Sequence, residues 1–410
     1  MAVSTPTAGF VHLHVHTEYS PLDGMTNIGE ACQKVAAEGQ SALAATDHGG
    51  TGGAWVLNRE AKKNGIKPLI GAEVYVAVME DYKDERDRTQ KQRVAVPRDD
   101  DSADDNDDEA GEKDAPNMKW KTNEHLTLFA TTKQGWINLA SMMDIAEVTG
   151  FYGKPRIDFA LLKEYSEGIL VLTGCLGGPV LGPVSRGDVE QARWNLNKII
   201  DAVGRDNVYM EIMEHGIDVE SNALPAMVEL AAEFGLTLVA TNDAHYLNED
   251  DGPAHEAWLA VASKKLLSDP KRFHFHGNGY FLRSEAEMRA LRPEAWWQTA
   301  CDNTVLVAER FDDNVLPEAY LRLPKYPLPE GFTSEMAFAR HLAKTGSAKR
   351  YGEPMPREVA DRLNSPRYSP SVMRQPQILM VEPIGCSCLD ESAIHCLATG
   401  GYPCRRRLAR

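Results

Sequence analysis

The chain has few cysteines and no long apolar run, and both absences exclude classes of protein. Only Cys32, Cys175 and Cys301 occur in its first 364 residues, which is typical of a reducing compartment and excludes a disulfide scaffold there. The longest apolar stretch, 169–184, is interrupted by glycines and prolines, so no segment is long enough for a transmembrane helix. The N-terminus lacks the basic and apolar regions of a signal peptide. We therefore expect a soluble, cytoplasmic protein with no membrane partner.

Negative charge is plentiful but unevenly distributed. The 410 residues carry a formal net charge of −16, and residues 80–118 alone contain fifteen acidic and seven basic side chains. With so little apolar content, this segment is predicted to be a disordered acidic insertion. A calcium loop is the less favoured alternative because no helix-loop-helix frame surrounds the acidic run. Half of the surplus charge lies in this insertion, so a phosphate-binding site elsewhere is not excluded.

The stretch 10–24, FVHLHVHTEYSPLDG, concentrates histidine. Three of the chain's twelve histidines, His12, His14 and His16, alternate here with apolar residues. On a β-strand this alternation places all three imidazoles on one face. Neutral imidazole nitrogen is a common ligand for zinc, manganese and iron. A single strand histidine is usually a satisfied polar group in the core, but three in five residues favour a metal site.

Six further apolar runs are predicted as strands that alternate with helices. The strands are expected at 11–16, 41–46, 68–78, 125–131, 169–173, 208–213 and 236–241, and the helices at 27–38, 54–64, 134–148, 187–203 and 220–234. Such alternation predicts parallel βα units in an open doubly wound sheet or a closed barrel. A closed barrel is favoured, because its C-terminal face most easily brings together the polar residues that follow strand ends, which are His48, Cys175, His215, Asp243 and His245.

The candidate metal ligands are too numerous for a single tetrahedral ion. They are His14, His16, Asp23, His48, Glu73, His125, His215, Asp243 and His245. A carboxylate inside an apolar strand, such as Glu73, must be paired or ligated, and Glu73 is placed to bridge two ions. Such a set suits two or three divalent ions of zinc, manganese, iron or magnesium. Clusters of this kind serve phosphoester hydrolysis, in which one ion activates water and its neighbour stabilises phosphoryl charge. Asp47 is expected to orient the His48 ring from behind, and Cys175 to lie beside the ligands.

Eight spaced motifs resemble one known family. In order they are HLHVHTEYSPLDG, ATDHGG, GAEVYV, HLTLFA, TGCLGGP, MEIMEHG, TNDAHYL and KRFHFHGNGYFLRSEAEM. They resemble the polymerase and histidinol phosphatase (PHP) domain at the N-terminus of the bacterial DNA polymerase III α subunit, over residues 10–364. The combination of the first motif with TDHG is more typical of the polymerase members than of the free-standing PHP phosphatases.

The resemblance implies an α/β fold, a distorted seven-stranded (β/α) barrel that binds up to three metal ions through the nine residues given above. It implies a place in DNA replication, with a DNA 3' end and the other polymerase and replisome components as partners. Members with a full ligand set are similar to metal-dependent 3'-5' exonucleases that proofread, whereas others are scaffolds. We expect Glu73 and Asp243 to act in catalysis through bound metal. His12 does not match the ligating pair of the family.

The resemblance also predicts how the chain is divided. Residues 1–9 are expected to be disordered, 10–285 to form the PHP barrel with its insertion at 80–118, and 286–364 to be a helical segment leading toward a polymerase palm. The palm motifs are absent, so nucleotide incorporation is not expected. Residues 365–410 change composition abruptly, and we interpret them as a largely disordered tail left by truncation or a frameshift. Its Cys386, Cys388, His395 and Cys396 do not fit usual zinc-finger spacing.

Three alternatives remain open from the sequence. The first is a metal-dependent phosphodiesterase that acts at a DNA 3' end. The second is a scaffold whose metals stabilise the fold without catalysis. The third is a phosphomonoesterase of the same superfamily. Trp296, Trp297, Lys264 and Lys265 are compatible with DNA contact, but core packing and a solvated helix surface are the favoured roles.

Overall fold

The computed structural model describes residues 9–79, 120–151, 153–277, 279–318 and 327–364. The chain divides into two compact units, Met1–Pro317 and Glu318–Arg410. The expected acidic insertion and the expected C-terminal tail lie outside the described residues. None of the described helices is both long enough and apolar enough to cross a membrane.

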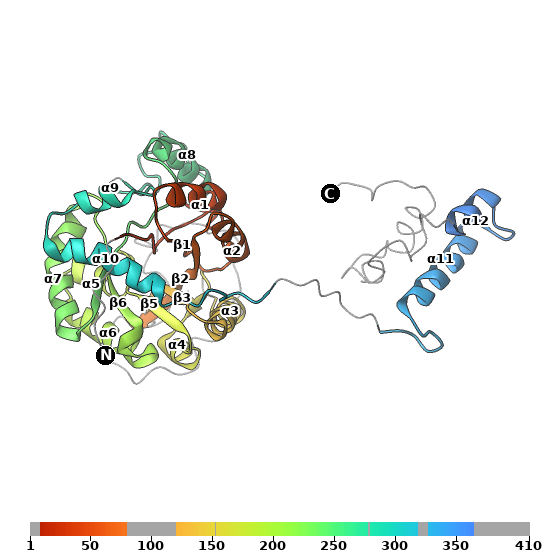
Figure 1. Ribbon diagram of the computed structural model, residues 1–410, viewed down its shortest axis with the longest axis horizontal. Coiled ribbons are helices and arrows are strands. Elements are labelled where there is room, and N and C mark those ends of the chain that lie inside the picture. Colours follow the sequence, from red (N-terminus) through yellow and green to blue (C-terminus); the bar gives the residue numbers. More distant parts are fainter. Residues whose placement is uncertain (1–8, 80–119, 152, 278, 319–326, 365–410) are drawn as a thin grey trace. The chain divides into compact units, whose positions relative to one another are not determined.

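The first unit is built on one curved seven-stranded sheet (Figure 1). Its order is β1-β2-β3-β5-β6-β7, and β4 pairs with β2 outside this path. The strands are β1 (Ala42–Ala45), β2 (Lys67–Met79), β3 (Trp120–Ala130), β4 (Arg156–Ile157), β5 (Ile169–Leu172), β6 (Val208–Ile212) and β7 (Thr237–Ala240). Strands β1, β5 and β6 are buried along their whole length, as expected for strands covered on both faces, and the second half of β7 is also buried.

Strand β3 differs from the expected parallel arrangement. It pairs antiparallel with both β2 and β5, whereas the other pairs are parallel. The pairing of Met79 with Trp120 shows that β3 begins at the end of the sheet where β2 finishes. Antiparallel neighbours need no crossover helix, so the alternation of parallel strands and helices is interrupted between β2 and β3. As a consequence His125 lies within a strand, opposite Tyr75, and not just beyond a strand end.

The opening stretch closes the curved sheet. Residues 10–16 form no assigned strand, but isolated bridges join His12 to Leu43 and Val15 to Ala244. The backbone N–H of Ala44 donates to the His12 carbonyl at 3.0 Å, and the N–H of His16 donates to the Ala244 carbonyl at 2.7 Å. Extended chain thus lies between β1 and the segment after β7. The expected distorted barrel of the α/β class is confirmed, with the first strand reduced to two bridges.

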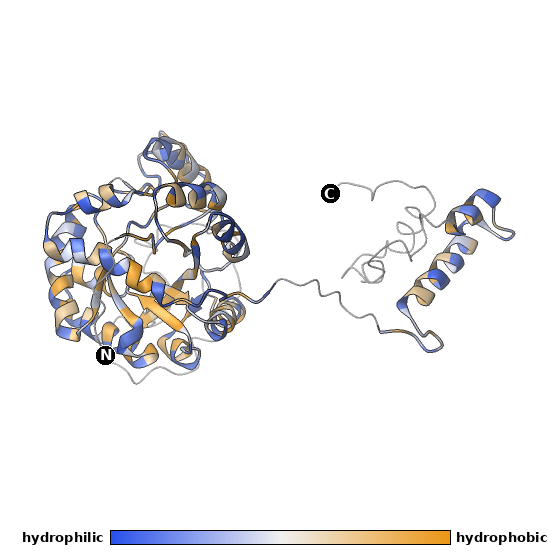
Figure 2. Ribbon diagram, viewed as in Figure 1, coloured by the Kyte–Doolittle hydropathy of each residue, from blue (hydrophilic) through white to orange (hydrophobic). Residues whose placement is uncertain are grey.

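Helices cover the outside of the sheet (Figures 1 and 2). Figure 2 shows apolar strands inside helices that have mixed polar and apolar faces, the pattern of amphipathic helices around one core. The expected helices are confirmed within about two residues at their ends, and three shorter helices, Phe159–Glu164, Leu181–Ser185 and Gly252–Ala262, were not expected. The helices of the barrel unit are α1 (Ile28–Ala37), α2 (Ala54–Lys63), α3 (Lys133–Val148), α4 (Phe159–Glu164), α5 (Leu181–Ser185), α6 (Val189–Val203), α7 (Asp218–Phe234), α8 (Gly252–Ala262), α9 (Glu285–Ala290) and α10 (Ala295–Glu309), with short 3-10 turns at Arg205–Asn207 and Glu249–Asp251.

Helices α9 and α10 belong to the barrel unit. Trp297 of α10 is fully buried in the main core, and its indole N–H donates to the Met288 carbonyl at 2.8 Å. The core role expected for this tryptophan is therefore confirmed. The division of the chain falls after Pro317, about thirty residues beyond the expected boundary, because α10 packs against β7. The second unit contains α11 (Glu335–Tyr351) and α12 (Arg357–Asn364).

Candidate metal centre

Candidate ligands from separate segments meet inside one end of the barrel. The imidazoles of His14 and His16 come from the opening stretch, and Asp23 comes from the loop after it. The remaining residues follow or lie within strands: His48 after β1, Glu73 in β2, His125 in β3, Cys175 after β5, and Asp243 and His245 after β7. Three overlapping groups have donor atoms that all lie within 4.8 Å of one another, namely His14, His16 and Glu73; His48, Glu73 and His125; and His16, His48 and His245.

Glu73 is the centre of the first two groups. Its carboxylate is 1% exposed, with Oε1 lying 3.4 Å from His14 Nε2 and Oε2 lying 3.5 Å from His16 Nε2. The two Nε2 atoms are themselves only 3.2 Å apart. The Nε2 atoms of His14 and His16 thus face the same carboxylate.

The second group shows the same feature more directly. His48 Nδ1 lies 2.7 Å from Glu73 Oε2, and His125 Nδ1 lies 3.3 Å from the same oxygen. Within the described part of the chain, neither His48 Nδ1 nor Glu73 Oε2 makes a hydrogen bond, although both atoms are buried. Buried polar atoms are nearly always satisfied. Two buried ligand atoms without hydrogen bonds fit a cation that both of them contact.

His245 completes the third group, and Asp23 lies beside it. Asp23 Oδ2 lies 3.0 Å from His48 Nε2 and 4.0 Å from His245 Nε2. The His16 ring stacks between the rings of His48 and His245, with centroid distances of 4.1 and 4.3 Å. Such stacking fixes the ring planes, so the nitrogens are preorganised before any ligand arrives.

Asp243 reaches the centre from a strained backbone. Its φ of 42° lies in the left-handed region, which aspartate tolerates better than most residues. Its Oδ1 is 3.1 Å from His16 Nε2 and 3.4 Å from His14 Nε2, and has no hydrogen-bond partner among the described residues. The Asp243 carbonyl accepts a 2.8 Å hydrogen bond from His245 Nδ1. This bond leaves Nε2 of His245 available as a ligand atom.

The buried carboxylates of the centre need positive charge close to them. Burial alone would raise the pKa of Glu73, but the nearby imidazoles of His125 and His48 hold it well below its usual value. Burial likewise opposes charge on His14, yet the carboxylates of Asp243 and Glu211 raise its pKa well above the usual value. Without a cation, protons on the imidazoles supply the compensating charge. Divalent ions would replace those protons, and the nitrogen and oxygen donors fit such ions.

The structure does not bring His215 into these groups. Its Nδ1 bonds to Glu220 Oε1 at 3.0 Å, and its Nε2 bonds to the backbone carbonyl of Asn242 at 2.9 Å. A carbonyl only accepts, so Nε2 carries the proton and offers no lone pair to a metal. The ring also stacks on Tyr280 at 4.1 Å. His215 therefore occupies a supporting position in the structure, unlike the ligand position expected from its place after β6.

Cys175 lies among the candidate ligands. Its Sγ is 3.5 Å from Glu73 Oε1 and 3.8 Å from His125 Nδ1. Burial and the neighbouring carboxylate of Glu73 raise the pKa of this thiol well above its usual value, so the thiol is neutral unless a cation is present. Its place just after β5 was visible in the sequence, but the sequence analysis assigned it a position beside the ligands.

Asp47 supports the centre through a different residue than expected. Its Oδ1 accepts hydrogen bonds from the Thr17 backbone at 2.7 Å and the Ser20 hydroxyl at 2.8 Å, and no described contact joins its carboxylate to the His48 ring. Ser20 Oγ in turn lies 3.3 Å from His16 Nδ1. Asp47 thus fixes the loop after the opening stretch, because its carboxylate faces that loop.

Glu211 was missed by the sequence analysis. This carboxylate in β6 is fully buried and accepts a 2.8 Å hydrogen bond from His14 Nδ1. It also accepts bonds from the Thr241 hydroxyl at 2.7 Å and the Gly174 backbone at 2.8 Å. The available signal was the same as for Glu73, an acidic residue inside an apolar strand. Glu211 orients His14 so that its Nε2 points into the centre.

We expect Glu211→Gln to weaken metal binding roughly 10- to 100-fold, the usual effect of losing a partner that orients a ligating histidine. Glutamine keeps the shape of the glutamate side chain but removes the negative charge that lies next to His14 Nδ1. Isothermal titration calorimetry of the metal-depleted chain with Zn²⁺ measures the change in the dissociation constant. Glu214→Gln is the matched control, because Glu214 is also buried but pairs with Arg292 outside the three groups. Equal affinities for Glu211→Gln and wild type would refute the orienting role.

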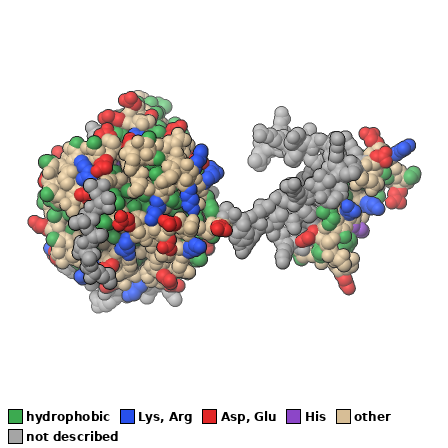
Figure 3. All heavy atoms as spheres, viewed as in Figure 1, with side chains coloured by type: hydrophobic (Ala, Val, Ile, Leu, Met, Phe, Trp, Pro, Cys, Tyr) green, Lys and Arg blue, Asp and Glu red, His purple; other side chains and the backbone are tan. Residues whose placement is uncertain are grey.

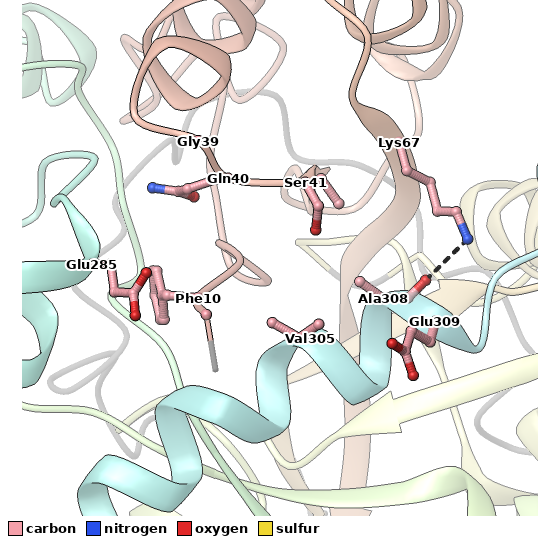
Figure 4. Close-up of a pocket in the computed structure, with 11 residues that line it drawn as sticks. Phe10, Gly39, Gln40, Ser41, Lys67, Glu285, Val305, Ala308 and Glu309 are labelled. Atoms are coloured by element: carbon pink, nitrogen blue, oxygen red, sulfur yellow. Dashed lines mark hydrogen bonds between the residues drawn. The ribbon is translucent and has the colours of Figure 1, made fainter. Parts of the chain in front are cut away.

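A cavity elsewhere in the barrel unit is not part of this centre. It has a volume of about 450 Å³ and lies beside the starts of β1 and β2 (Figure 4). None of its lining residues is a candidate ligand. The Lys67 ammonium beside it already donates to the carbonyls of Ala308 and Phe311, at 3.4 and 2.9 Å. The candidate ligands lie at the other end of the strands.

Comparison with known proteins agrees with this description. Residues 12–215 match the PHP domain family. The DNA polymerase III subunit alpha of Thermus aquaticus is 35% identical over 348 residues, which cover 83% of this chain and 26% of the relative. The corresponding subunit of Mycobacterium leprae is 36% identical, with 87% and 29% covered. The chain thus spans about a quarter of the length of these relatives.

Among solved structures, the similarity in fold is modest. A putative metal-dependent phosphoesterase from Bifidobacterium adolescentis has a TM-score of 0.35 and 12% identity, with 59% of this chain and 89% of that chain covered. The sequence relationship is the stronger one. On its family match and its relatives, this chain belongs to the PHP family and is similar over most of its length to DNA polymerase III alpha subunits.

Proposed function

We propose that this chain is a metal-dependent phosphodiesterase that removes nucleotides from a DNA 3' end. The observation that carries the proposal is the set of buried, unsatisfied ligand atoms around Glu73, namely His48 Nδ1, Asp23 Oδ1, Asp243 Oδ1 and Glu73 Oε2, which lack hydrogen-bond partners among the described residues. Because buried polar atoms are nearly always satisfied, four such atoms in one place support bound cations.

The residues divide into ligands and supports. In this proposal two or three divalent ions of zinc, manganese, iron or magnesium are held by His14, His16, Asp23, His48, Glu73, His125, Cys175, Asp243 and His245. When bound, such ions acidify water and stabilise charge on phosphoryl oxygens. Glu73 belongs to two groups and bridges them, while Asp243 spans His14 and His16. Glu211 orients His14, and the buried walls exclude bulk water from the centre.

Replication is the proposed setting. The relatives are named as DNA polymerase III alpha subunits, so the proposed substrate is a mismatched primer end and the proposed role is proofreading. Other replisome components are the proposed partners, and the cytoplasm is the proposed location. Hydrolysis from the 3' end is part of this proposal.

A primer assay tests the function. Purified chain is incubated with Mn²⁺ or Zn²⁺ and a primer that carries a 3' mismatch and a 5' label. We expect stepwise shortening that EDTA stops and that Asp243→Asn removes. His341→Ala is the control, because His341 is an exposed histidine of the second unit.

Other outcomes identify the competing functions. An intact primer together with hydrolysis of a phosphomonoester would identify a small-molecule phosphatase. An intact primer and no hydrolysis, with a melting temperature that metal raises, would identify a structural metal site. Both outcomes would overturn the exonuclease proposal.

A further inference from the structure

Helix α8 and the segment after it pack directly on the metal centre. The His255 ring of α8 lies with its Nε2 2.7 Å from the backbone carbonyl of Asp23. Phe275 meets His245 edge-on, with ring centroids 4.6 Å apart, and lies 5.0 Å from His255. The inner side of this segment therefore contacts two of the candidate metal ligands, Asp23 and His245. Figure 1 shows α8 at the edge of the barrel unit.

The outer side combines apolar and basic residues that have no described partner. Trp258 and Val261 are 39% and 69% exposed, and Leu266 and Leu267 are 75% and 57% exposed. Lys264, Lys265 and Lys271 are also exposed, and none of them forms an ion pair with a residue that the structure describes. We call the outer side of residues 258–273 the entrance ridge.

The charge of the entrance ridge opposes that of the whole chain. The chain carries a net charge of −16, and on the face shown in Figure 3 acidic and basic side chains of the barrel unit are interspersed. Along the ridge, four basic residues accompany a single aspartate, Asp269. Arg272 pairs with Glu256, which leaves the three lysines as free positive charges. A local excess of unpaired lysine attracts a polyanion.

We propose that the entrance ridge binds the single-stranded nucleic acid whose end enters the metal centre. This inference rests on the proposed function and identifies the surface that guides its substrate. Lysines pair with backbone phosphates without reading sequence, and exposed aromatic rings provide stacking surfaces for bases. The rings of Phe273, Phe275 and His245 follow one another at centroid distances of 5.7 and 4.6 Å. Phe273 ends the ridge, two residues after Lys271, and the three rings lead from there to the centre.

The test removes the three lysine charges and keeps the fold. Lys264 has a φ of 54°, the left-handed conformation in which α8 ends, so Lys264→Gly fits its backbone better than any other replacement. The test variant is Lys264→Gly/Lys265→Ser/Lys271→Ser. The control variant is Lys133→Ser/Lys163→Ser. These two lysines are exposed and lie near the junction where β3 ends and β5 begins, away from the centre.

Binding is measured with the full chain and a fluorescent single-stranded oligonucleotide of about 15 nucleotides with phosphorothioate linkages, so that cleavage does not interfere. Anisotropy is recorded over a range of salt concentrations. Each lost phosphate contact lowers the slope of log affinity against log salt by about 0.7 for single strands, so the test variant is expected to lose about 2 units of slope. The control variant is expected to retain the wild-type slope.

Two results would overturn the inference. One is an unchanged slope and affinity in the lysine variant. The other is loss of oligonucleotide binding in Leu266→Ser/Leu267→Ser but not in the lysine variant, which would show that apolar contacts, and not the lysine charges, hold the nucleic acid. Failure of the primer assay is a separate outcome. If the wild-type chain does not shorten primers but the lysine variant loses oligonucleotide binding, the entrance ridge is supported and the exonuclease proposal is refuted.

Discussion

Glu73→Gln is expected to reduce metal-dependent hydrolysis of the primer by at least about 100-fold. Loss of a residue that only orients a ligand costs roughly 10- to 100-fold in metal affinity or activity, and Glu73 is itself the residue shared by two of the three groups. The amide removes the negative charge that joins them and turns one acceptor oxygen into a donor that faces His48 or His16. The rate of primer shortening, measured at saturating Mn²⁺, gives the effect.

Two controls separate chemistry from folding in this experiment. Glutamine has nearly the volume of glutamate, and circular dichroism together with the melting temperature of the metal-free chain checks that the barrel is intact. Asp243→Asn is a second variant, because asparagine also tolerates the φ of 42° found at this position. If a folded Glu73→Gln chain shortened primers at the wild-type rate, Glu73 would not hold the ions.

Removing metal is expected to lower the melting temperature of the wild-type chain by about 10 °C. A ligand present at about 1,000 times its dissociation constant stabilises the folded state by about 4 kcal/mol, and each kcal/mol shifts the melting temperature of a domain of this size by roughly 2–4 °C. The physical reason is local. When the metal is removed, the carboxylates and imidazoles buried around Glu73 lose the cation that their lone pairs coordinate. Differential scanning calorimetry before and after dialysis against EDTA measures the shift.

The matched control for this shift is the chain with His48→Gln and Asp23→Asn. These substitutions remove one pair of ligands, 3.0 Å apart, and leave the group of His14, His16 and Glu73 in place. We expect the EDTA-dependent shift to become smaller without vanishing. Identical melting temperatures for metal-loaded and metal-free wild type would contradict the account, because ions that bind only the folded state must stabilise it.

Much of the candidate centre was predictable because its residues follow a simple rule. Strands place their final residues at one edge of a sheet, so His48, Asp243 and His245 were expected to meet. The opening alternation correctly placed His14 and His16 on one face. The same rule failed for His215, because its ring hydrogen-bonds to the Glu220 carboxylate in the first turn of α7. No periodicity in the sequence distinguishes a histidine bound to a metal from one bound to a carboxylate.

The reversal of β3 was the main error in the expected fold. Short apolar runs do not reveal strand direction, and the residues between β2 and β3 gave no helical pattern from which to infer a crossover. Glu211 was overlooked for a related reason. Its partner His14 is 197 positions away in the sequence, and only the barrel brings the two together. Local patterns therefore predicted which candidate ligands lie together better than they predicted the residues that support them.

Metal content tests the central claim most directly. The chain is loaded with Zn²⁺, desalted, and analysed by inductively coupled plasma mass spectrometry against protein concentration from amino-acid analysis. The overlap of three groups at shared residues predicts two or three tightly held ions per chain, and fewer in Glu73→Gln. A wild-type chain that retains no more than one ion would contradict a multinuclear centre.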